Sequence, residues 1–83
     1  MTVSLPRTGI VTPALDACAI GMAIRNARKA HGLTQAELAG LAGTGVRFVS
    51  ELERGKPGVE LGKLLDVLAV LGLRMLMVAE GAA

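Results

Sequence analysis

The sequence predicts a small, mainly α-helical domain of four to five helices that ends in a short β-strand. Three observations support this fold class. Apolar residues recur at intervals of three and four, as they do along one face of a helix. Glycines follow these segments at positions typical of helix ends. The composition is 52% hydrophobic with Phe48 as the single aromatic residue, which favours a core of Leu, Ala and Val side chains.

The chain length of 83 residues fits one small domain. A chain of this size buries only about 60–65% of the surface that its unfolded form exposes, so association with a second chain is a common source of additional stability. Cys18 is the single cysteine, which excludes an internal disulfide and a cysteine-based zinc site. The sequence contains neither a signal peptide nor an apolar run long enough to cross a membrane, so we expect a cytoplasmic protein.

The first helix is expected over residues 13–31. Thr12 supplies an N-cap, Pro13 suits the first helical position, and Gly32 is a natural stop. Residues 1–11 lack periodicity, and we interpret them as a flexible N-terminal arm.

The strongest local signature lies at the start of the second helix, expected over residues 35–42. Thr34 and Glu37 have the spacing of a capping box, in which the hydroxyl and the carboxylate each accept a hydrogen bond from the other residue's amide. Residues 43–45 then lead to a third helix, which ends at Gly55. Two short helices joined by such a turn are typical of a helix-turn-helix, with a plain helical hairpin as the alternative.

Leucines at three- and four-residue intervals predict a fourth helix over residues 60–71, which Gly72 stops. Residues 73–78 differ, because both faces of this segment would be apolar apart from Arg74. A lone strand has no partner inside a helical monomer, so we expect it to pair with the same strand of a second chain. The alternative is that the fourth helix simply continues. The expected dimer-interface residues are Leu73, Met75, Leu76, Met77 and Val78.

These elements divide the chain into the arm at 1–11, a helical domain at 12–72, and a dimerisation strand and tail at 73–83.

Charge is distributed unevenly along the chain. Residues 25–56 carry six basic and three acidic side chains, whereas residues 57–83 carry two basic and three acidic side chains. A basic middle suggests an anionic partner, although scattered charges are commonly just solvated surface. An aromatic content of 1% argues against base stacking with RNA or single strands.

No combination of residues points to catalysis. His31, the only histidine, precedes Gly32 at an expected helix end, where a cation suits the helix dipole. The sequence offers no set of nucleophile, base and orienting group, no metal-ligand cluster and no phosphate-binding loop. We therefore expect no enzyme activity, no metal and no cofactor.

Two motifs resemble the Cro/repressor (xenobiotic-response-element) family of helix-turn-helix domains. They are Leu33-Thr-Gln-Ala-Glu-Leu-Ala39 and Ser50-Glu-Leu-Glu-Arg-Gly-Lys56, with Ala42-Gly43 between them. The resemblance covers about residues 16–73 and implies a lambda-repressor-like fold, in which the third helix enters the major groove of DNA. The C-terminal Gly-Leu-Arg-Met-Leu-Met-Val is similar to HipB-type antitoxins, in which this segment forms an intersubunit strand and the partner is a HipA-type serine/threonine kinase toxin.

The resemblance implies three groups of functional residues. Val46, Arg47 and Glu51 are expected at base edges, where they suit a thymine methyl, guanine and cytosine respectively. Arg28 and Glu53 are expected to form an ion pair that ties the first helix to the third. The expected contacts to the DNA backbone are Thr34, Gln35, Thr44, Gly45, Ser50, Arg54 and Lys56, with solvated surface as the alternative for the last two. Gly45 departs from the family pattern, because a Ser or Thr usually caps this helix.

The implied function is that of a sequence-specific transcriptional repressor that binds double-stranded operator DNA as a homodimer. By its likeness to HipB-type antitoxins, it would also neutralise a HipA-like kinase toxin and autoregulate the operon. Two alternatives remain open at this point. The chain could be a stand-alone repressor without a toxin, or a protein-interaction adaptor on the same fold.

Overall fold

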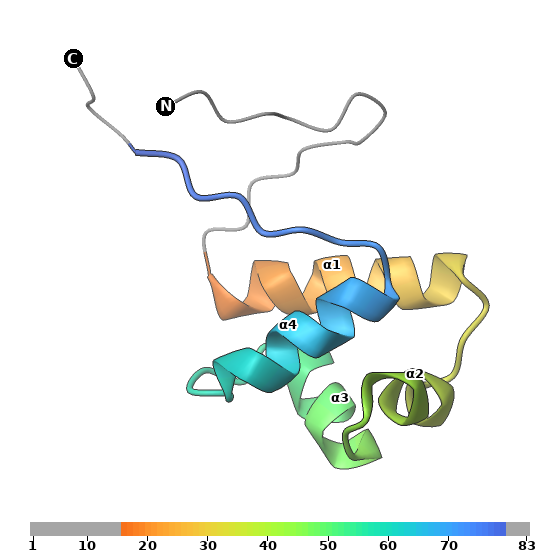
Figure 1. Cartoon of the computed structure of the whole chain (residues 1–83). Helices are drawn as coiled ribbons and strands as arrows, with labels where there is room; N and C mark the ends of the chain where they lie inside the picture. Colours follow the sequence, from red (N-terminus) through yellow and green to blue (C-terminus); the bar gives the residue numbers. More distant parts are fainter. Residues whose placement is uncertain (1–15, 80–83) are drawn as a thin grey trace.

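The computed structural model describes residues 16–79, which contain four helices. They are α1 (Ala17–Ala30), α2 (Gln35–Ala42), α3 (Val46–Glu53) and α4 (Leu61–Val70). In Figure 1, α1 lies at the top, α2 and α3 lie at the bottom, and α4 lies between them at the front. The mainly helical class is therefore confirmed. Among the described residues, no helix has the length and apolar character that a membrane crossing requires.

The first helix begins four residues later than the sequence pattern indicates. Asp16 has an extended backbone, and its side chain accepts a hydrogen bond of 2.8 Å from the amide of Ala19. This contact satisfies one of the free amides at the start of α1, so the N-cap is Asp16 and the prediction of a start at residue 13 is wrong. The expected cap and arm lie outside the described residues: Thr12, Pro13 and residues 1–11.

All four helices end in the same way, at a glycine with a left-handed backbone. At the end of α4, the amide of Gly72 donates to the carbonyl of Ala69 and the amide of Leu73 donates to the carbonyl of Leu68, at 3.2 and 2.9 Å. This pair of bonds is a Schellman motif, which requires a positive φ that glycine adopts without strain. The chain therefore leaves the helix at Gly72, and the alternative that the fourth helix continues is excluded. The four glycines are Gly32, Gly43, Gly55 and Gly72.

The core lies where the four helices meet, and each helix contributes to it. Leu61 and Leu65 belong to the leucine pattern of α4 but remain 60% and 46% exposed, because the helix turns its Leu64, Val67 and Leu68 side inward. Around this core α1 packs on α3, α3 packs on α2, and α2 packs on α4. The buried hydrophobic residues are Ile24, Leu38, Ala39, Val49, Leu52, Leu64, Val67, Leu68 and Leu71.

α1 and α3 approach each other closely at Gly21. A Cβ atom built on Gly21 would overlap the carbonyl oxygen of Leu52 and lie 3.0 Å from that of Glu53. A similar approach joins the end of α3 to the start of α1, where a Cβ atom on Gly55 would lie 2.7 Å from the sulfur of Cys18. The absence of side chains at these two positions therefore sets how closely the two helices pack.

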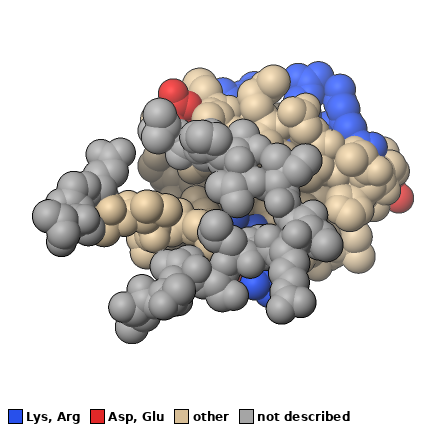
Figure 2. Space-filling view, turned by 90° about the horizontal axis from the view of Figure 1, so that it is seen from above, with Lys and Arg blue, Asp and Glu red and all other residues tan. Residues whose placement is uncertain are grey.

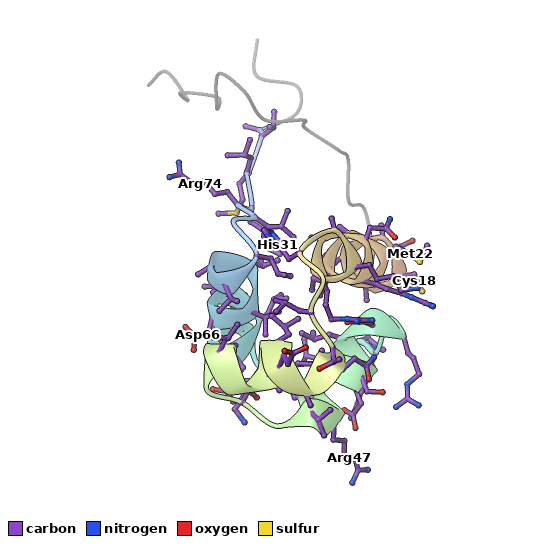
Figure 3. All side chains as sticks on the ribbon, turned by 90° about the vertical axis from the view of Figure 1, so that its right-hand side faces the viewer. Cys18, Met22, His31, Arg47, Asp66 and Arg74 are labelled. Atoms are coloured by element: carbon purple, nitrogen blue, oxygen red, sulfur yellow. The ribbon has the colours of Figure 1, made fainter. Side chains whose placement is uncertain are left out.

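The C-terminal segment, residues 73–79, leaves the helical body beyond α4 (Figures 1 and 3). Leu73 packs against the core, whereas Met77 and Val78 are 91% and 79% exposed. Within the described residues this segment forms no strand. A strand here would need a partner, so the expected pairing stays a prediction.

Candidate nucleic-acid interface

The helix-turn-helix consists of α2, residues 43–45 and α3. The capping box at the start of α2 is confirmed: the hydroxyl of Thr34 accepts from the amide of Glu37 at 3.0 Å, and the carboxylate of Glu37 accepts from the amide of Thr34 at 2.9 Å. The hydrogen bonds from the amide and the hydroxyl of Thr34 lower the pKa of Glu37 below its usual value. The carboxylate is thus kept ionised at the positive end of the α2 dipole, which it stabilises.

The start of α3 has no side-chain cap. Gly45 occupies the N-cap position and is exposed, and no side chain bonds to the first turn. The hydroxyl of the preceding Thr44 is buried and has no hydrogen-bond partner among the described residues. In this conformation the Thr44 hydroxyl cannot reach a phosphate, whereas the backbone at Gly45 can.

Glu53 ties three parts of the fold together. Its carboxylate accepts two hydrogen bonds from Arg28, at 2.6 Å from Nε and 3.0 Å from Nη2. Its Oε1 atom also accepts a hydrogen bond of 3.2 Å from Nε2 of the Gln35 side chain. The Nη1 atom of Arg28 donates to the carbonyl of Leu33. The Arg28 and Glu53 side chains are 12% and 4% exposed. The structure therefore joins α1, the start of α2 and the end of α3 through one ion pair.

Burial alone would raise the pKa of Glu53. The hydrogen bonds from Arg28 and Gln35, together with the positive charge of Arg28, outweigh burial and hold the pKa of Glu53 below its usual value. The hydrogen bond to Glu53 also raises the pKa of Arg28. Both groups therefore remain charged at neutral pH.

Arg47 and Glu51, two of the three expected base-contact residues, contact each other one turn apart on α3. Nε of Arg47 donates to Oε1 of Glu51 at 3.0 Å, and Nζ of Lys56 donates to the other oxygen, Oε2, at 2.7 Å. The Arg47 side chain is 90% exposed, whereas that of Glu51 is only 17% exposed. The hydrogen bond from Lys56, followed by that from Arg47, lowers the pKa of Glu51. Sequence reasoning did not find the contact with Lys56.

The remaining expected residues differ in their exposure. Val46, at the start of α3, is half exposed, Ser50 is partly buried, and Arg54 is exposed at the end of the helix. Figure 3 shows Arg47 pointing outward at the bottom of the molecule, whereas Arg74 on the C-terminal segment lies at the top. The N-terminal end of α3, which carries Arg47, and the C-terminal segment therefore lie on opposite sides of the helical body.

The side seen from above in Figure 2 carries little charge on its visible described atoms. Most of these atoms belong to uncharged residues, and Lys and Arg gather mainly along one edge of the view. On this face the visible basic side chains are therefore not spread evenly.

Comparison with known proteins identifies the family. The helix-turn-helix family model matches residues 24–76. The uncharacterized HTH-type transcriptional regulator y4mF of Sinorhizobium fredii is 48% identical over 62 residues, which are 75% of this chain and 82% of that protein. The match to the family model and this degree of identity over most of both proteins each establish membership.

Solved structures share the same fold. A chain of the HipA–HipB–O2–O3 complex and a chain of the HipB–O4 20mer complex each superpose with a TM-score of 0.76, at 23% identity, covering 84% of this chain and 99% of theirs. The clp gene regulator ClgR of Corynebacterium glutamicum superposes with a TM-score of 0.63 at 38% identity, covering 74% of this chain and 64% of that one.

By its match to the family model and to the curated relative, the chain belongs to the Cro/repressor-type helix-turn-helix family of transcriptional regulators, and it is not an enzyme.

Proposed function

We propose that the protein is a repressor that binds operator DNA as a homodimer and reads the major groove with α3. The observation that carries this proposal is the side chain of Arg47, which is 90% exposed on the helix that the family uses for recognition. Its Nε atom is bound to Glu51, which leaves both Nη groups free for O6 and N7 of a guanine. Val46 lies one residue away with half of its surface exposed and suits a thymine methyl.

Contacts to phosphate would hold α3 in the groove. The amides at the start of α3, which no side chain caps, offer donors to anions. The start of α2 offers fewer donors, because the capping box occupies the amides of Thr34 and Glu37. Arg54 is exposed at the other end of α3 and can reach the flanking backbone. The proposed set of backbone contacts is Thr34, Gln35, Thr44, Gly45, Ser50 and Arg54, of which Thr44 would act through its backbone. Lys56, the seventh residue expected at the backbone, is bound to Glu51 instead.

The C-terminal segment would form the dimer. Met77 and Val78 expose apolar side chains that a second copy would cover, and antiparallel pairing about a two-fold axis would satisfy the backbone donors of both strands. Such an axis would place two copies of α3 about 34 Å apart, the spacing of successive major grooves on one side of DNA. The proposed interface residues are Leu73, Met75, Leu76, Met77 and Val78.

The similarity of the fold to a chain of the HipA–HipB–O2–O3 complex supports a narrower proposal, that the protein is the antitoxin of a HipA-like kinase. A gene for such a kinase beside this one, and rescue of cells from its toxicity by co-expression, would support the antitoxin over a stand-alone repressor. A protein that binds the kinase but no DNA would instead be an adaptor.

The test of DNA binding is selection of bound duplexes from a random library, followed by footprinting upstream of the protein's own gene. Arg47→Ala should cost roughly 1–3 kcal/mol on the selected sequence and leave binding to random DNA nearly unchanged. Lys29→Ala is the control, because Lys29 is exposed on α1, outside the proposed interface. Wild-type protein that enriches no sequence would reject the proposal.

A further inference from the structure

We infer that Glu51 and Lys56 set sequence specificity by positioning Arg47, and that Glu51 itself reads no base. This inference rests on the proposed function, because it concerns how the same helix reads DNA. It gives both residues a new role. From the sequence, Glu51 was expected to contact a base and Lys56 was expected to contact a phosphate.

The first step is the occupancy of the Glu51 carboxylate. Its Oε1 atom accepts from Nε of Arg47 and its Oε2 atom accepts from Nζ of Lys56. Both oxygens are therefore engaged by charged donors, which form the stronger kind of hydrogen bond, so a cytosine amino group could use only the remaining lone pair of an oxygen that is already bound. With 17% of its side chain exposed, Glu51 also has little surface to offer a base.

The second step is the way in which Arg47 is held. A guanidinium group has five N–H donors in a fixed plane, and Glu51 engages only the Nε donor on the inner side. The two Nη groups have no hydrogen-bond partner among residues 16–79. Glu51 therefore restrains the side chain while leaving free the pair of donors that guanine requires.

The third step is the anchoring of Glu51 by Lys56. An exposed Arg–Glu pair one turn apart on a helix contributes only about 0.3–0.5 kcal/mol by itself, so it holds a side chain loosely. Lys56 is bound to residue 51 twice, through the side chain at 2.7 Å and through its backbone amide, which donates to the carbonyl of Glu51 at 3.1 Å. The turn after α3 thus places the Lys56 ammonium where it fixes the second oxygen of Glu51.

In the experiment the Glu51→Gln, Lys56→Met and Arg47→Ala variants each select bound duplexes from a random library. The base preferences of the three variants are then compared. The control is Lys29→Met, which removes an exposed lysine from α1. Glu51→Gln and Lys56→Met should each weaken discrimination at the base pair that Arg47→Ala affects, by roughly twofold to fivefold, the range of exposed ion pairs. The Lys29→Met profile should match the wild type.

Three results would overturn the inference. If Glu51→Gln changes preference at a second base pair and not at that of Arg47, Glu51 reads a base. If Lys56→Met weakens operator and random DNA equally and lowers the salt dependence by about one counterion, Lys56 binds phosphate. If Lys56→Met costs the same in the Arg47→Ala background as in the wild type, the two residues are independent. Failure of the proposed function looks different, because the wild-type protein would then select no sequence.

Discussion

The guanidinium group of Arg28 on α1 donates two hydrogen bonds to the carboxylate of Glu53 at the end of α3. Both side chains are partly buried, with 12% and 4% of their surfaces exposed. Because a third donor of Arg28 binds the turn before α2, the pair connects α3 to the rest of the domain. The stability of the fold and the position of α3 therefore depend on the same contact.

Replacing one partner of this pair should destabilise the protein strongly. Arg28→Met would leave the Glu53 carboxylate buried without its ion pair, at a cost of roughly 3–5 kcal/mol in the free energy of unfolding. Urea denaturation measures this change. Lys29→Met, an exposed position on the same helix, is the control and should change stability by less than about 0.5 kcal/mol. A free energy of unfolding of Arg28→Met close to that of the wild type would contradict the structural role of the pair.

The same pair predicts an acid-dependent loss of stability. The pKa of Glu53 is lower in the folded protein than the ordinary value of a glutamate, so the folded state binds the proton less readily than the unfolded chain. The stabilisation is complete above about pH 4.5 and falls as pH decreases through the folded-state pKa. Unfolding free energies measured between pH 7 and acid should therefore decline more steeply for the wild type than for Glu53→Gln. Parallel curves would show that Glu53 does not carry this dependence.

Two glycine-to-alanine substitutions should have opposite effects. Gly21→Ala would force α1 and α3 apart, because the new methyl group overlaps the backbone of Leu52, and we expect a cost of about 1–3 kcal/mol. Gly40→Ala meets no atom within 4 Å in the middle of α2 and should stabilise the protein by about 0.5–1 kcal/mol. Thermal unfolding of both variants tests the packing of α1 on α3. Equal effects would contradict it.

A charge in the C-terminal segment should separate the proposed dimer without disturbing the fold. Met77 is 91% exposed, so Met77→Glu leaves the helical core intact. If residues 73–78 pair across a two-fold axis, the variant would bring two carboxylates into an apolar interface, and sedimentation should show a monomer. The control is Met22→Glu, at a 53% exposed position on α1. A Met77→Glu protein that still sediments as a dimer would place the interface on the helices.

The elements that local chemistry determines were predictable from the sequence. The capping box at Thr34 and Glu37 and the glycine that ends each helix depend on residues a few positions apart, and the structure has both features. The start of α1 was missed because both Thr12 and Asp16 are residue types that cap helices. The structure uses Asp16, the later of the two. Local signals of this kind identify that a helix exists more reliably than where it begins.

Features that arise only from tertiary packing were not predictable. Nothing next to Gly21 in the sequence indicates that α3 crosses it closely, because the contact is with residues 31 and 32 positions away. The hold of Lys56 on Glu51 likewise depends on the turn geometry after α3. The family resemblance placed Arg47 and Glu51 each at a base edge, and the structure adds a hydrogen bond between the two side chains.

Arg47 and the C-terminal segment lie on opposite sides of the helical body (Figure 3). If α3 reads DNA as we propose, a substitution at Arg47 changes the sequence that is read without touching the segment through which we propose that two chains pair. After gene duplication, two copies with different target sequences would keep matching pairing segments. Such copies would form mixed dimers that recognise hybrid sites, until changes in residues 73–78 insulated one regulator from the other.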